Sequence, residues 1–182
     1  MKTLIFIAAM FLISCAGTRH GFVPLEQFPD GAIYGRHDAF TNVTYYRHKE
    51  FLPGAMKGIS PAEVYITRTA SGLNPRIIFT YVGNGWLFMS RAILANGTGN
   101  NIRFGFNDWD VKREVLSGGY VKETWQTTIT TARAVELLAF FETGTPSVQL
   151  SGEKRAEYMF TDRYVMANVR MLQEYIKRVD GD

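Results

Sequence analysis

The chain has 182 residues, of which 46% are hydrophobic and 14% aromatic, and its formal net charge is +3. This length and apolar content suffice for one sizeable buried core, so one globular domain is expected rather than two. Lysine and arginine are scattered along the sequence, which argues against a nucleic-acid-binding protein. A single cysteine, Cys15, leaves no disulfide scaffold and no cysteine-based zinc site.

The first 14 residues have the order of a secretory signal peptide. Lys2 precedes an apolar stretch at residues 4–13, and small residues follow from Ser14 onward. A transmembrane helix needs about 20 apolar residues, so this stretch is too short to span a bilayer. We therefore expect residues 1–14 to be a signal peptide and to take no part in the fold.

The segment Leu12-Ile13-Ser14-Cys15 resembles the lipobox of bacterial lipoproteins, in which a branched apolar residue and a small residue precede an invariant cysteine. The resemblance implies cleavage before Cys15, a diacylglyceryl group on its thiol, and acyl chains such as palmitate. Two or three acyl chains anchor a protein stably, whereas one does so only marginally. The alternatives are an ordinary signal peptide cut near Ala16 or Gly17, with Cys15 discarded, and an uncleaved anchor.

The residue after the lipobox bears on the location. The residue after Cys15 is Ala16 and not an aspartate. In this respect the chain resembles lipoproteins that Gram-negative bacteria sort to the outer membrane. The resemblance implies a bacterial cell-envelope protein, facing the periplasm if the source is Gram-negative. Its expected partners are the membrane, through the lipid anchor on Cys15, and an envelope protein.

Residues 15–55 differ in composition from the segments on either side. Proline and glycine recur there and argue against long regular elements, yet large apolar side chains are too frequent for a solvated linker. We expect a short tether followed by a loop-rich arm that packs on the body. Residues 41–47, "TNVTYYR", could supply one edge strand.

Residues 56–182 are expected to form a single α+β domain. Residues 62–70 alternate, with Val64 and Ile66 on one face, and five more strand patterns follow. Short turns separate them, which predicts antiparallel neighbours in a meander of about six strands. The other five patterns cover residues 76–82, 86–94, 102–106, 111–116 and 120–129.

After residue 129 the apolar period becomes helical. Thr130 or Thr131 can cap a helix that reaches residue 143, in which Val135, Leu138 and Phe141 recur at helical spacing. A short strand at 147–152 then pairs with 156–160.

A closing amphipathic helix over 162–178 places Val165, Val169, Leu172 and Ile176 on one face, which we expect to lie on the sheet. Strands followed by helices are typical of α+β folds. This carboxy-terminal order is loosely similar to that of uncharacterised exported bacterial proteins, a resemblance that implies a fold and no activity.

The arm holds the candidates for a metal site. His37, Asp38 and His48 lie within twelve residues, and histidine and carboxylate side chains can ligate divalent ions. Their spacing matches no known metal motif, and the alternative is that they are surface or hydrogen-bonded groups.

The sequence contains few other candidates for catalytic or phosphate-binding residues. Asp108 and Asp110 have strand spacing and would share one face with Glu114, either as an acidic patch or as a solvated strand end. The sequence lacks a Gly-x-Ser-x-Gly elbow, a phosphate-binding glycine loop and a Ser-x-x-Lys triplet at a helix start. No catalytic residue and no cofactor are therefore expected, which favours a non-enzyme without deciding the point.

Three functions remain open. The first is a noncatalytic, membrane-anchored envelope lipoprotein whose domain binds a ligand or protein partner, consistent with a sheet that carries Trp86, Trp109 and Trp125. The second is a structural or assembly subunit of an envelope complex, packing through exposed strand edges. The third is an envelope hydrolase that uses carboxylates or the histidines of the arm.

Overall fold

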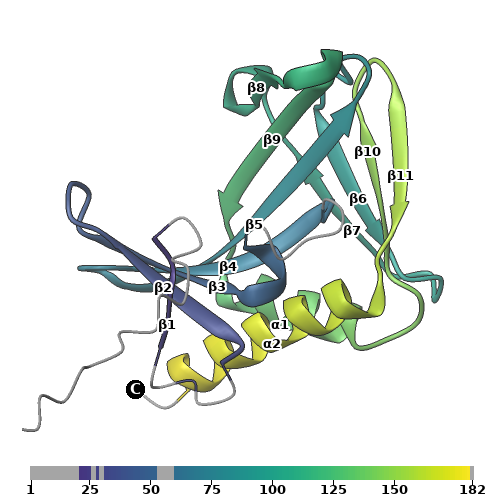
Figure 1. The fold of residues 1–182 in the computed structure, drawn as a ribbon. Coiled ribbons are helices and arrows are strands. Elements are labelled where there is room, and N and C mark those ends of the chain that lie inside the picture. Colours follow the sequence, from purple (N-terminus) through teal and green to yellow (C-terminus); the bar gives the residue numbers. More distant parts are fainter. Residues whose placement is uncertain (1–20, 26–27, 29–30, 53–59, 181–182) are drawn as a thin grey trace, which may run out of the picture.

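The structure, a computed structural model, describes residues 21–25, 28, 31–52 and 60–180. The predicted signal peptide and Cys15 lie outside these residues. Within them the chain forms two α-helices and eleven strands in two antiparallel sheets, which confirms the predicted α+β class (Figure 1). No helix in this part of the chain is long and apolar enough to cross a membrane.

The larger sheet has seven strands. Five consecutive strands form a meander, and β9 and β8 extend it beyond β5, in the order β1-β2-β3-β4-β5-β9-β8. The strand expected from residues 41–47 is β3, but it lies between β2 and β4 and not at an edge. The seven strands are β1 (Val23–Pro24), β2 (Ile33–Asp38), β3 (Val43–His48), β4 (Ala62–Thr69), β5 (Gly72–Gly83), β8 (Lys112–Val115) and β9 (Val121–Thr128).

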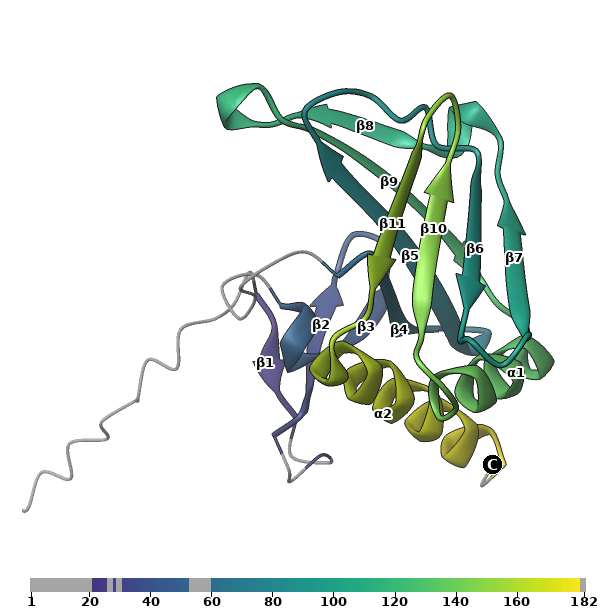
Figure 2. The same ribbon diagram turned by 90° about the vertical axis from the view of Figure 1, so that its right-hand side faces the viewer.

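The smaller sheet has the order β11-β10-β6-β7. It consists of β6 (Arg91–Ala95), β7 (Asn101–Gly105), β10 (Ser147–Ser151) and β11 (Arg155–Met159). The expected single meander is thus divided, because the β6–β7 hairpin leaves the larger sheet and β9 takes the place beside β5. Figure 2 shows the smaller sheet standing in front of β5 and β9, with both helices along its lower end.

A buried carboxylate fixes the crossing between the sheets. Glu123 on β9 is completely buried and accepts hydrogen bonds from the backbone N–H groups of Leu87 (2.5 Å), Phe88 (2.9 Å) and Met89 (2.7 Å). Phe88 has a positive φ of 53°, which interrupts the extended run predicted from residue 86 and delays β6 to Arg91. The segment before β6 is therefore held against β9 by its backbone instead of pairing as a strand.

The turn between β10 and β11 packs closely on this crossing. A Cβ atom added to Gly152 would lie 1.9 Å from the carbonyl oxygen of Phe88, a distance that no side chain can adopt. Glycine is required here by the close approach of two backbones.

The first helix, α1 (Thr131–Phe141), begins as predicted, because Thr130 accepts a hydrogen bond from the backbone N–H of Arg133 through its hydroxyl (3.2 Å). Its buried face differs in part from the prediction: Phe141 is buried as expected, but Val135 is 50% exposed, and the buried face also includes Ala134, Leu137 and Phe140. The helix packs against α2 as well as the sheets, so its buried stripe is centred one position away from the expected one.

The second helix, α2 (Asp162–Val179), lies on the larger sheet, as predicted for the closing helix. Leu172 is fully buried, but Val169 is only partly buried, as are Val165 and Ile176, which contact the core from the flank. The centre of the buried face is instead formed by Tyr164, Ala167, Asn168, Met171 and Tyr175.

Asn168 attaches α2 to the sheet. Its side-chain oxygen accepts the backbone N–H of Val64 on β4 (2.7 Å), and its amide nitrogen donates to the carbonyl of Tyr164 (2.9 Å). The pairing of β3 with β4 ends at Tyr46 and Ile66, so the N–H of Val64 lies beyond the ladder and the helix satisfies it.

The two sheets enclose an aromatic core. Phe79 of β5 and Trp125 of β9 meet Phe104 of β7 and Phe106, with ring centroids 4.2 to 6.5 Å apart. Such rings bury large areas and gain from offset and tilted contacts. This cluster holds the β9 half of the larger sheet against the smaller sheet.

Candidate functional site

Strand alternation places a set of arginine and tyrosine side chains on the outer face of the larger sheet. Val64 and Ile66 point into the core, so Glu63 and Tyr65 of the same strand point outward. Arg36 pairs with Tyr45 across β2 and β3, and Tyr65 pairs with Arg76 across β4 and β5, which brings their side chains onto one face. We call this the arginine–tyrosine face, defined by Arg36, Tyr45, Arg47, Tyr65, Arg76 and Gln126.

The face is hollowed. A hollow of about 270 Å³ lies over five strands and is lined by Phe22, Arg36, Tyr45, Arg47, Tyr65, Ile78 and Gln126. Because neighbouring strands hold these side chains through a continuous ladder, their relative positions are set by the sheet and not by a loop.

Arg47, which lines the hollow, and Glu63 form a partly buried ion pair. The Nε of Arg47 donates to Oε1 of Glu63 (2.5 Å) and its Nη2 donates to Oε2 (2.6 Å), a two-point contact. Glu63 is only 7% exposed, and burial raises the pKa of its carboxyl against the opposing effect of Arg47. This carboxylate is committed to Arg47 and balances one of the three arginines of the face.

The other two arginines lie on aromatic rings. The guanidinium carbon of Arg36 is 5.2 Å from the ring centre of Phe22 and 5.1 Å from that of Tyr45, and that of Arg76 is 5.8 Å from Tyr65. Neither arginine has a carboxylate within ion-pair distance among the described residues, and the buried Nε of Arg76 has no hydrogen-bond partner there. The face therefore has an excess of positive charge.

Tyr65 closes the hollow towards β9. Its hydroxyl donates to Oε1 of Gln126 (2.7 Å), and burial raises its pKa, so it stays a neutral hydrogen-bonding group. The carboxylate of Glu63 is held by Arg47, so it is not available as a general base. The chemistry that the described residues of this face support is anion binding by guanidinium groups.

The histidine and aspartate candidates of the arm are not brought together. His37 is exposed and its Nδ1 lies 3.1 Å from Oγ1 of Thr44, whereas His48 is buried and its ring accepts the backbone N–H of Glu50. His37 pairs with Thr44 and His48 with Ile33, which separates the two histidines by about 13 Å along the strands.

Asp38 forms a turn rather than a metal ligand set. Its carboxylate accepts hydrogen bonds from the backbone N–H groups of Phe40 and Thr41. The pKa of Asp38 is lowered chiefly by the Thr41 side chain and then by these backbone groups. Across the described residues, no group of three or more histidine, cysteine, aspartate or glutamate side chains is placed to hold a metal ion.

The predicted common face for Asp108, Asp110 and Glu114 is wrong. Asp108 and Asp110 lie in a 3-10 turn (Asp108–Asp110) before β8, not on a strand, so strand alternation does not apply to them. Asp108 pairs with Arg113 at 2.5 Å, and Glu114 pairs with lysines, which lower its pKa. Asp108 and Glu114 therefore belong to surface ion pairs.

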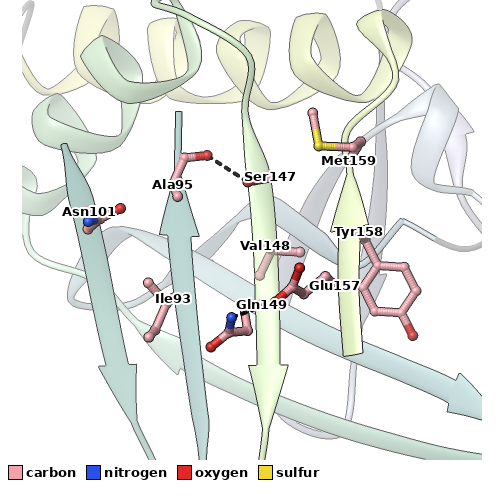
Figure 3. A pocket seen from close by; sticks show the side chains of 9 residues that line it. All are labelled: Ile93, Ala95, Asn101, Ser147, Val148, Gln149, Glu157, Tyr158 and Met159. Carbon is pink, nitrogen blue, oxygen red and sulfur yellow. Dashed lines mark hydrogen bonds between the residues drawn. The ribbon is translucent and has the colours of Figure 1, made fainter. Parts of the chain in front are cut away.

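A second hollow, of about 430 Å³, lies on the outer face of the smaller sheet (Figure 3). Ile93 and Ala95 of β6 and Gln149 of β10 line it, with Glu157 of β11 beside them. The amide of Gln149 donates to Glu157 (2.8 Å), and the hydroxyl of Ser147 donates to the carbonyl of Ala95 (3.0 Å). Because these polar groups satisfy one another, this hollow offers a ligand less than the arginine–tyrosine face does.

The sequence reasoning did not find the arginine–tyrosine face. The available signal was the repeated spacing of tyrosine and arginine two residues apart, as in Tyr34 and Arg36 or Tyr45 and Arg47. On adjacent strands this spacing aligns the side chains on one face. Comparisons with protein-family models, with curated proteins and with solved structures found no match for this chain.

Proposed function

We propose that this protein is a noncatalytic lipoprotein of the bacterial cell envelope, anchored through acyl chains on Cys15, whose globular domain binds a negatively charged ligand. The observation that carries the binding role is the charge of the arginine–tyrosine face. Three guanidinium groups lie on it, and the carboxylate of Glu63 pairs with one of them. The proposed anchor rests on the resemblance of Leu12-Ile13-Ser14-Cys15 to a lipobox.

The chemistry of stacked arginines supports anion binding. A guanidinium group that lies over an aromatic ring keeps its N–H edge free for two parallel hydrogen bonds to a carboxylate or phosphate. Arg36 is exposed and lies between the rings of Phe22 and Tyr45, which limits the conformations that it would lose on binding. The face is thus partly organised before a ligand arrives.

The proposal is tested by capture from envelope extract. The full chain, immobilised in neutral detergent, is exposed to the extract, and retained protein, glycan and lipid are identified by mass spectrometry. The double variant Arg36→Gln with Arg76→Gln should lose a specific retained component. Its matched control is Arg103→Gln with Arg155→Gln, which removes the same charge from exposed positions on the smaller sheet.

Comparison with the control double variant shows which result would contradict the proposed binding role. If the two double variants and the unmodified chain retain the same components in equal amounts, the face is not the binding site. A component that all forms retain would instead favour an assembly role through another surface.

A further inference from the structure

We propose that the ligand of the arginine–tyrosine face is the phosphate group of anionic phospholipids in the membrane to which the protein is anchored. This inference rests on the proposed function, because it needs both the acyl anchor at Cys15 and an anion-binding face. It adds the chemical class of the ligand and the source that supplies it.

The short chain between the proposed anchor and the domain limits how far the arginine–tyrosine face can lie from the membrane. Phe22 follows Cys15 by seven residues, and a chain of that length spans at most about 25 Å when fully extended. Phe22 itself belongs to the hollow, since its ring centre is 5.2 Å from the guanidinium carbon of Arg36 and 5.9 Å from that of Arg47. An anchor at Cys15 would therefore keep this face, and not merely the domain, close to the bilayer.

Strand pairing fixes where the tether joins the domain. In β1, Val23 pairs with Gly35 and Pro24 with Tyr34 of β2, and a Cβ added to Gly35 would meet Leu25 at 2.9 Å. The chain thus enters the domain along the edge of the sheet nearest Arg36. The first described residues after the proposed anchor therefore lie at the same edge of the sheet as Arg36.

The charges on the face match a headgroup layer. Arg36, Arg47 and Arg76 lie on this face with Glu63, and the carboxylate of Asp38, at the end of β2, is bound to backbone N–H groups. Anionic leaflets attract such clusters, and the planar guanidinium fits phosphate oxygens in pairs. Tyr45 adds a ring of the kind that lies at membrane interfaces.

The test is binding of the full chain to vesicles. Cys15→Ser removes the acyl chains, and the protein is sedimented with vesicles of phosphatidylcholine alone or mixed with phosphatidylglycerol. Phosphatidylglycerol should strengthen binding, and Arg36→Gln with Arg76→Gln should weaken it about thirtyfold at low salt. The control pair Arg103→Gln with Arg155→Gln should change it less than about threefold.

Several results would overturn the inference. These are equal losses in the two double variants, no preference for phosphatidylglycerol, and displacement by millimolar inorganic phosphate, which would identify a site for free phosphate. Arg36→Gln alone guards against misfolding, because Arg36 is exposed, and it should still weaken binding. If vesicle binding fails while envelope capture by the face succeeds, the proposed function stands with a different anionic ligand.

Discussion

Three glutamates are buried among the described residues, and two of them, Glu123 and Glu63, are stabilised in different ways. Glu123 accepts three backbone N–H groups, and the Nε of Arg113 lies 3.6 Å from its Oε2, so the backbone and this guanidinium together stabilise the carboxylate. Glu63 depends on one side chain, Arg47, and burial raises its pKa. Glu123 connects the two sheets, and Glu63 pairs with an arginine of the arginine–tyrosine face.

The raised pKa of Glu63 predicts a pH-dependent stability. The folded protein holds a proton on this carboxyl more readily than the unfolded chain does, so its contribution to the free energy of unfolding is complete below the ordinary glutamate pKa. That contribution is lost as the pH rises through the folded pKa. The stability of the unmodified protein relative to Glu63→Gln should therefore decrease as the pH rises above the ordinary glutamate pKa, as measured by urea unfolding at a series of pH values.

A matched substitution separates this effect from general charge. Glu136→Gln changes a side chain that is 51% exposed on α1 and should alter stability by less than about 0.5 kcal/mol throughout. If the unmodified protein instead gained stability over Glu63→Gln as the pH rose, the ion pair with Arg47 would outweigh burial.

At the scale of elements, local patterns predicted most strands and both helices. Residues 62–70, 102–106 and 147–152 correspond to β4, β7 and β10 within two residues, because turn residues and strict alternation mark their ends. The division into two sheets was not predictable in this way. It depends on Glu123 reaching the backbone of Leu87, a contact between residues 36 positions apart that leaves no local pattern.

The helix faces show a related limit. The stripe Val165, Val169, Leu172 and Ile176 follows the apolar residues, yet the buried face of α2 also includes Asn168 and Ala167. Asn168 is buried because it satisfies the backbone of β4, and hydrophobic periodicity cannot indicate that role.

The closing helix is expected to be essential for stability. Leu172 is fully buried in the core, so Leu172→Ala should lower the free energy of unfolding by about 2–5 kcal/mol. Met166 on the same helix is 65% exposed, and Met166→Ala should change it by less than about 0.5 kcal/mol. Urea denaturation measures both, and equal small effects would show that α2 does not stabilise the sheet.

At the scale of the whole molecule, the anchor and the binding face form one proposal. A seven-residue separation between Cys15 and Phe22 limits how far the arginine–tyrosine face can lie from a membrane that holds the acyl chains. The sequence alone suggested the anchor, because a lipobox is read from four adjacent residues. The two-residue spacing of tyrosine and arginine indicated single strand faces, but the arginine–tyrosine face combines residues from five strands whose order only the folded sheet reveals.

The central claim is that Cys15 carries the anchor, and acyl labelling tests it most directly. Expressed in a bacterium with its own amino-terminal segment, the protein should incorporate labelled palmitate and partition into detergent, because acyl chains would supply the membrane affinity. Cys15→Ser should abolish both properties and leave the melting temperature of the domain unchanged. An unmodified protein that is released soluble and unlabelled, with its new amino terminus after Ala16 or Gly17, would contradict the account.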